Sequence, residues 1–102
     1  MTPEAPTLVP RPTTEEATKT LPPWKVLLHD DDVTTFEFVI WLLVKLFGKP
    51  FDEAVRLTWE IHTGGVGLVA VTTQERAELY VEQVHSLARP RGFPLTASAE
   101  PV

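Results

Sequence analysis

Apolar residues change their spacing several times along this chain, and each change marks a predicted element. Residues 24–28, Trp-Lys-Val-Leu-Leu, follow two prolines and are typical of a strand. Residues 66–71, rich in Val and Leu, predict a second strand. Residues 93–98 predict a short last strand, which Pro94 would place at an edge of the sheet, and residues 100–102 are expected to fray.

The first predicted helix is apolar on nearly every side. A capping box formed by Thr34 and Glu37 predicts its start, and it runs over residues 35–47 to a stop at Gly48. A helix of this kind is either deeply buried or covers a binding site. Because complete burial is hard to arrange in so small a domain, we expect this helix to cover a site.

Two further helices complete the predicted fold. The second begins at Pro50, which suits a first helical turn, and ends at the glycine pair of residues 64–65. The third follows a capping box at residues 72–75 and ends near Pro90. The order β-α-α-β-α-β predicts an α+β fold, a small single-domain sandwich in which a three-stranded antiparallel sheet packs against three helices.

The N-terminal segment differs from the rest of the chain. Residues 1–23 contain six prolines and almost no large apolar residue, so they are predicted to form a disordered extension. This extension either keeps the domain in solution or gives a partner a flexible arm to grip. Residues 24–102 form the predicted core domain, because a 102-residue chain with 43% hydrophobic residues supplies one modest core.

Composition argues against some classes of function. The formal net charge is -5 and the nine Lys and Arg residues are scattered, which argues against nucleic-acid binding. No apolar run reaches the roughly 18 residues of a membrane span, because Lys45 interrupts the longest candidate. The chain has no cysteine for disulfides or thiolate metal sites and no signal-peptide pattern, so we expect a soluble, cytoplasmic protein.

The most informative polar stretch is His-Asp-Asp-Asp-Val-Thr at residues 29–34, between the first strand and the apolar helix. Three adjacent carboxylates beside apolar surface are costly unless a cation or hydrogen-bond donors balance them. An α-ammonium group brings both charge and donors, and Asp30, Asp31 and His62 offer suitable acceptors. Taken alone, the aspartates also fit a solvated turn with a helix cap, and His62 also fits a helix-end residue that bonds a carbonyl.

Catalytic motifs are weak or missing. The aspartates with His29 and His62 could ligate a divalent metal, but the sequence has no HExxH motif and no EF-hand loop. Ser86 and Ser98 lack a G-x-S-x-G context, and the glycine-rich residues 64–67 lack the Lys-Ser/Thr of a phosphate loop. The residues therefore favour a binding module that is not an enzyme and uses no metal or cofactor.

The opening of the core domain carries a specific resemblance. Residues 24–39, Trp-Lys-Val-Leu-Leu-His-Asp-Asp-Asp-Val-Thr-Thr-Phe-Glu-Phe-Val, closely resemble the ClpS family, adaptors of the bacterial Clp protease. That family reads roughly Tyr/Trp-Lys-Val-x-Leu-x-Asn-Asp-Asp-x-Thr-Pro-Met-Glu-Phe-Val there. Residues 61–65 match its V-H-x-x-G motif, and residues 73–78 and 93–95 match later segments in the right order and spacing. The resemblance covers residues 24 to about 100.

The resemblance implies an adaptor that binds the free N-terminal Leu, Phe, Tyr or Trp of N-degron polypeptides and delivers them to a Clp AAA+ unfoldase. It places the α-amino group of the substrate at Asp30, Asp31 and His62. It lines the side-chain pocket with Thr34, Phe36, Val39 and Leu95. We therefore expect a monomer that has no enzymatic activity and partners an unfoldase N-terminal domain.

Two site positions depart from the family pattern. Asp30 occupies a position where the family usually has Asn, and an ionised Asp accepts hydrogen bonds but cannot donate them. We therefore expect the α-ammonium group still to be bound, with an affinity that depends more strongly on salt concentration. Phe36 stands where Met is common, and a rigid ring is expected to narrow the pocket and shift the preference among Leu, Phe, Tyr and Trp. Thr35 replaces a Pro, and either residue suits a first helical turn.

The surface that would meet the unfoldase is less well matched. Glu75 corresponds to an acidic residue at the family's partner interface, whereas Tyr80 replaces a Lys that is common nearby. The sequence does not distinguish between a ClpA-type and a ClpC-type partner.

A structural interaction domain is the alternative function, because the element order also resembles the C-terminal domain of the ribosomal stalk protein. That domain lacks the Asp-Asp and His-x-x-Gly combination.

Overall fold

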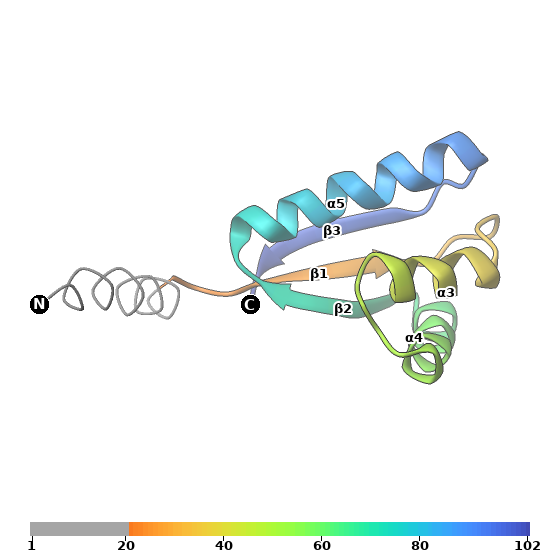
Figure 1. Ribbon diagram of the computed structural model, residues 1–102, viewed down its shortest axis with the longest axis horizontal. Helices are drawn as coiled ribbons and strands as arrows, with labels where there is room; N and C mark the ends of the chain where they lie inside the picture. The colour runs from red at the N-terminus through yellow and green to blue at the C-terminus, as the bar shows by residue number, and fades with distance from the viewer. Residues whose placement is uncertain (1–20) are drawn as a thin grey trace, which may run out of the picture.

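The computed structural model describes residues 21–102, and most of the extension predicted over residues 1–23 lies outside this range. The elements are β1 (Trp24–His29), α3 (Phe36–Lys45), α4 (Phe51–Gly64), β2 (Val66–Thr72), α5 (Gln74–Ala88), the 3-10 turn η1 (Arg89–Arg91) and β3 (Thr96–Pro101). Within the described residues, this order confirms the predicted α+β fold of three helices and a three-stranded antiparallel sheet (Figure 1).

β1 is the central strand of the sheet. The strand order is β2-β1-β3, and β1 is antiparallel to both neighbours, so that Leu28 lies opposite Gly67 on one side and Ala97 on the other. α5 lies along one face of the sheet, whereas α3 and α4 gather at the end where β1 finishes (Figure 1). The loop that follows β1 therefore begins beside both of these helices.

The core takes its side chains from alternate positions of β1 and from one side of each helix. The largest fully buried side chains include Val26, Leu28, Leu42, Leu43, Val69, Val84 and Leu95. Burial of one such side chain contributes roughly 1.5–3 kcal/mol. The other apolar side of α3 is only half-buried or exposed, at Phe36, Ile40, Trp41 and Val44. This helix is therefore not enclosed by the core.

The start of α3 differs from the prediction by one residue. Thr35, not Thr34, is the N-cap, and its hydroxyl accepts a hydrogen bond from a first-turn amide at 3.2 Å. Thr34 is instead turned toward Asp31, because its amide and hydroxyl both donate to the Asp31 carboxylate. α3 also ends at Lys45, two residues before the predicted end, and α5 has Thr73 as its cap.

The last strand lies further along the chain than predicted. β3 covers Thr96–Pro101 instead of residues 93–98, so Pro94 precedes the strand and the residues expected to fray are paired up to Pro101. β1 explains the difference, because it pairs along its whole length and its first residue, Trp24, lies opposite Pro101. The extent of β3 is thus determined by a partner strand that is distant in sequence.

Candidate functional site

Asp31 organises the loop between β1 and α3. Its carboxylate accepts hydrogen bonds from the amides of Val33 and Thr34, at 2.8 and 2.7 Å, and from the hydroxyl of Thr34, at 2.7 Å. Burial raises the pKa of Asp31, but these hydrogen bonds and the charge of Arg89 outweigh it and hold the pKa below its ordinary value. Asp31 is therefore ionised at neutral pH, and much of its hydrogen-bonding capacity is used within the loop.

Asp30 lies beside His62. The amide of Asp30 donates to the carbonyl of Gly65 at 2.9 Å, which fastens the loop to the end of α4. Gly65 has a φ of 88°, a left-handed conformation that favours glycine and ends the helix. The Asp30 carboxylate thereby lies 3.7 Å from Nδ1 of His62, whose side chain is half exposed. A carboxylate and an imidazole nitrogen therefore share one solvent-accessible edge.

A narrow cavity lies behind these polar groups. Its lining residues are Asp30, Asp31, Thr34, Phe36, Val39, Thr58, Ile61, His62 and Leu95. The structure thus brings together all seven residues that the sequence suggested for the amine and side-chain sites. The volume open to the centre of a water molecule is about 10 Å³, so the cavity as it stands holds about one water molecule.

The inner wall of the cavity is apolar and closely packed. Val39, Ile61 and Leu95 are buried, and the hydroxyl of Thr58 donates to a backbone carbonyl one turn earlier in α4, at 2.7 Å. Gly67 of β2 allows α4 to approach the sheet, because a Cβ at this position would lie 2.5 Å from Cγ1 of Ile61. The wall therefore offers an incoming side chain mainly hydrocarbon.

Aromatic rings pack at the mouth of the cavity. The ring of Phe36 lies 4.9 Å from that of Trp59 and 5.0 Å from that of His62, both edge to face. Sequence reasoning missed Trp59, and it also missed Thr58 and Ile61 of the inner wall. For Thr58 and Trp59 the available signal was helical spacing, since they lie four and three residues before His62 on α4.

Metal ligands are not grouped in the described part of the molecule. Within residues 21–102, no set of three or more His, Cys, Asp or Glu side chains is placed to hold a metal ion. His29, which the sequence offered as a ligand, has its Nε2 2.7 Å from the hydroxyl of Ser98. Among the same residues, no helix has the length and apolar character needed to cross a membrane.

Comparison with known proteins identifies the family. Residues 19–98 match the family model described as ATP-dependent Clp protease adaptor protein ClpS. The chain belongs to the ClpS family. The ClpS adapter of Desulfatibacillum aliphaticivorans is 49% identical to it over 90 residues, which are 86% of each chain. That of Lawsonia intracellularis is 42% identical over 79 residues, or 78% of this chain and 72% of the relative.

A solved ClpS structure has the same fold. ClpS2 of Agrobacterium tumefaciens, in a structure bound to L-phenylalaninamide, is similar with a TM-score of 0.77 and 32% sequence identity. The match covers 79% of this chain and 98% of ClpS2. Sequence and structure therefore agree on a ClpS adaptor of the Clp protease, and they support this resemblance over the stalk-protein alternative.

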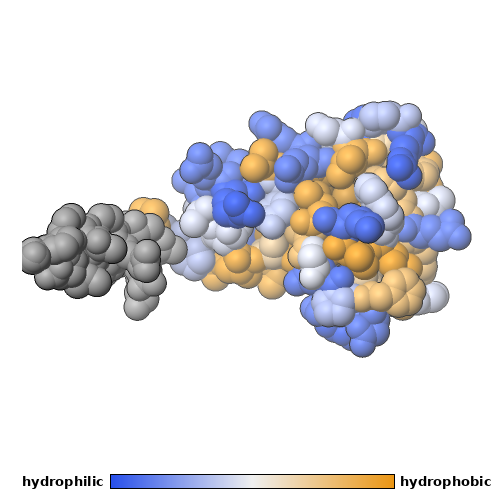
Figure 2. All heavy atoms as spheres, in the orientation of Figure 1, coloured by the Kyte–Doolittle hydropathy of each residue, from blue (hydrophilic) through white to orange (hydrophobic). Residues whose placement is uncertain are grey.

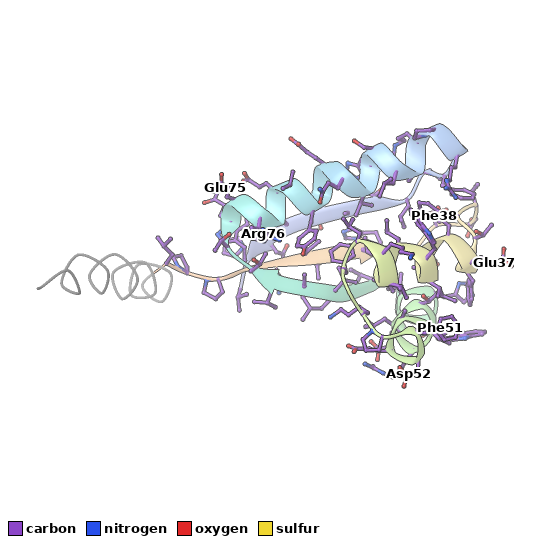
Figure 3. All side chains as sticks on the ribbon, in the orientation of Figure 1. Glu37, Phe38, Phe51, Asp52, Glu75 and Arg76 are labelled. Atoms are coloured by element: carbon purple, nitrogen blue, oxygen red, sulfur yellow. The ribbon has the colours of Figure 1, made fainter. Side chains whose placement is uncertain are left out.

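In this ClpS protein, the two residues expected at the unfoldase interface lie on α5. Glu75 is exposed in the first turn, at the end of α5 that lies far from α3 and α4 in Figure 3. The ring of Tyr80 stacks on Phe47 at 4.6 Å and lies 5.8 Å from the guanidinium of Arg76. Arg76 therefore supplies a positive charge beside Tyr80.

Proposed function

We propose that this ClpS adaptor, a monomer in the cytoplasm, binds polypeptides by a free N-terminal Leu, Phe, Tyr or Trp. The observation that carries the proposal is one cavity with carboxylates and an imidazole at its mouth and an apolar inner wall. The solved relative bound to L-phenylalaninamide adds support, because that ligand combines a free α-amine with an apolar side chain. The adaptor selects substrates and leaves their hydrolysis to the protease.

Asp30 and His62 are assigned the direct contacts with the α-amino group. Asp30 Oδ1 and His62 Nδ1 lie 3.7 Å apart, so one ammonium group placed between them donates to both. Asp31 adds negative charge nearby and retains some accepting capacity beyond its loop hydrogen bonds. An acetylated terminus would leave the acceptors unpaired, at a cost of roughly 1–3 kcal/mol.

The side chain of the first residue enters between Val39, Ile61 and Leu95. Because the cavity as it stands holds about one water molecule, it must widen to admit that side chain. Phe36 is the part that moves: it is the first residue of α3, it is half-buried, and its ring packs on the exposed Trp59. Burial of a Leu or Phe side chain contributes about 1.5–3 kcal/mol, which offsets the displacement of the ring.

Delivery to the unfoldase uses a different surface, around Glu75 and Tyr80 on α5. Glu75 is exposed and Arg76 lies next to it, so this helix end presents both charges to a partner. The partner is the N-terminal domain of a ClpA-type or ClpC-type unfoldase. Binding substrate at one end of the fold leaves α5 free to contact the unfoldase.

Fluorescence anisotropy with labelled peptides tests the binding proposal. We expect a peptide that begins with Leu or Phe to bind at least about tenfold more tightly than its N-acetylated twin or a Met-initiated version. Asp30→Ala and His62→Ala should each weaken binding of the free-amine peptide. Asp32→Ala removes the same charge from the same loop and should not. Equal binding of all three peptides would indicate an unspecific apolar surface and would refute the proposal.

A further inference from the structure

A strip of apolar side chains runs along the junction of α3 and α4, outside the cavity. On each helix its members are four residues apart, so they lie on one side of that helix. This α3–α4 strip consists of Phe36, Ile40, Val44, Phe51, Val55 and Trp59. Phe51 is 67% exposed and Trp59 is 52% exposed, whereas the other members are half-buried. The strip therefore lies outside the buried core.

The far part of the strip is hollowed into a groove. Its lining residues are Glu37, Ile40, Trp41, Val44 and Phe51, of which only Glu37 is polar. The volume open to the centre of a water molecule is about 400 Å³, far more than in the cavity. Figure 2 shows the apolar surface over α3 and the adjoining part of α4, and Figure 3 shows Glu37 and Phe51 on the same side of the molecule. A groove of this kind is typical of a binding surface.

The strip is continuous with the cavity. Phe36 belongs to both, because it lines the cavity and its ring contacts Trp59 at 4.9 Å. Val44 is eight residues after Phe36 on α3, so this part of the strip is about 12 Å long at 1.5 Å per residue. An extended polypeptide advances about 3.3 Å per residue, so the strip has room for roughly three or four residues.

We propose that the α3–α4 strip binds the substrate residues that directly follow the first one, and that it prefers apolar side chains there. This inference rests on the proposed function of the cavity. The strip meets the cavity at Phe36, so a chain whose first residue occupies the cavity can continue along the strip, away from the carboxylates of the β1–α3 loop. The strip offers this chain apolar contacts, and Glu37 at its edge disfavours acidic residues in the substrate. The occupant is therefore the same polypeptide whose terminus the cavity holds.

Three ligands that share a free N-terminal leucine separate the cavity from the strip. They are leucinamide, a peptide with Ser and Gly at positions 2–5, and a peptide with Phe, Ile and Leu at those positions. We expect the apolar peptide to bind about tenfold more tightly than the polar peptide. Phe51→Ser and Val44→Ser should remove most of this difference while leaving leucinamide binding unchanged. The changed residues lie outside the cavity lining, and Phe51 is exposed enough for its variant to fold.

Val71→Ser is the matched control, because Val71 is 56% exposed on β2 and is not part of the strip. It should leave all three affinities unchanged. No binding of leucinamide would refute the proposed function itself. If leucinamide binds but the polar and apolar peptides have equal affinities, only the role of the strip is refuted. The same follows if Val71→Ser reduces the affinity for the apolar peptide as much as Phe51→Ser does. If Phe51→Ser instead converts a dimer to a monomer in sedimentation without changing peptide affinity, the strip contacts a second copy and the inference is overturned.

Discussion

Asp30 and Asp31 are adjacent and chemically identical, yet the fold places them in different surroundings. Asp31 accepts three hydrogen bonds from its own loop, whereas the backbone of Asp30 is tied to α4 and its carboxylate faces His62. Loop geometry therefore depends on Asp31. In the proposed function Asp30, not Asp31, makes the direct contact with the α-amino group of the ligand, and Asp30 adds a negative charge there.

Asp31→Ala is expected to destabilise the fold by about 1–2 kcal/mol, because three loop donors lose their shared acceptor. The pKa of Asp31 is lowered in the folded protein, so its stabilisation is present above the ordinary value of 3.8 and is lost as the pH falls through the lower folded pKa. Urea unfolding at pH 7 and at decreasing pH measures both effects.

Asp32→Ala is the control for this prediction, because the exposed Asp32 lies in the same loop. It should change the free energy of unfolding by less than about 0.5 kcal/mol. If Asp31→Ala unfolds at the same urea concentration as the wild type, the loop does not depend on the Asp31 hydrogen bonds.

At the scale of elements, α5 and β3 are joined through His85. Nε2 of His85 accepts a hydrogen bond from the amide of Ala97 at 3.1 Å, and β3 is an edge strand of the sheet. Burial lowers the pKa of His85, and the positive charge of Arg89 lowers it further. A neutral imidazole thus caps an edge amide that would otherwise be free to pair with another chain.

His85→Gln should alter how stability depends on pH. The pKa of His85 is lowered in the folded protein, so the unfolded chain takes up the proton first as the pH falls below 6.5. The wild-type protein therefore loses stability with falling pH until the folded pKa is reached. Glutamine does not titrate, so the melting temperature of the His85→Gln variant should fall less between pH 7 and pH 5 than that of the wild type. At pH 8 the variant should be less stable by about 0.5–1.5 kcal/mol. Parallel melting curves across this range would contradict the assignment.

The elements show where sequence patterns suffice and where they do not. Within residues 21–102, apolar spacing and capping residues predicted the three α-helices and three strands in the right order, because these signals act within a few residues. The errors arose from competing contacts. Thr34 is turned toward Asp31 while Thr35 caps α3, and the pairing with β1 extends β3 to Pro101.

Across the whole molecule, Glu75 lies at the end of α5 far from α3 and α4 (Figure 3), whereas the candidate site is formed by the β1–α3 loop, α3, α4 and Leu95. The family motif pointed to residues from the loop, both helices and the segment before β3, and the structure places all seven around one cavity. The residues that were missed, among them Trp59 and Ile61, depend on how α4 is rotated against the sheet. That rotation is limited by the close approach of Ile61 to Gly67, a contact that no local pattern encodes.

Because the cavity and the proposed unfoldase surface use different residues, substitutions should impair peptide binding and unfoldase binding separately. Glu75→Ala should weaken binding to the N-terminal domain of the unfoldase by about 1 kcal/mol, roughly fivefold, because one exposed charge pair is lost. The same variant should bind an N-terminal Leu peptide with unchanged affinity, since Glu75 lies on α5 and takes no part in the cavity. Asp30→Ala should show the reverse, with weak peptide binding and intact unfoldase binding. Anisotropy with a labelled peptide and with a labelled unfoldase domain measures both. A Glu75→Ala protein that loses peptide affinity would mean that the two surfaces are coupled through the sheet and are not independent.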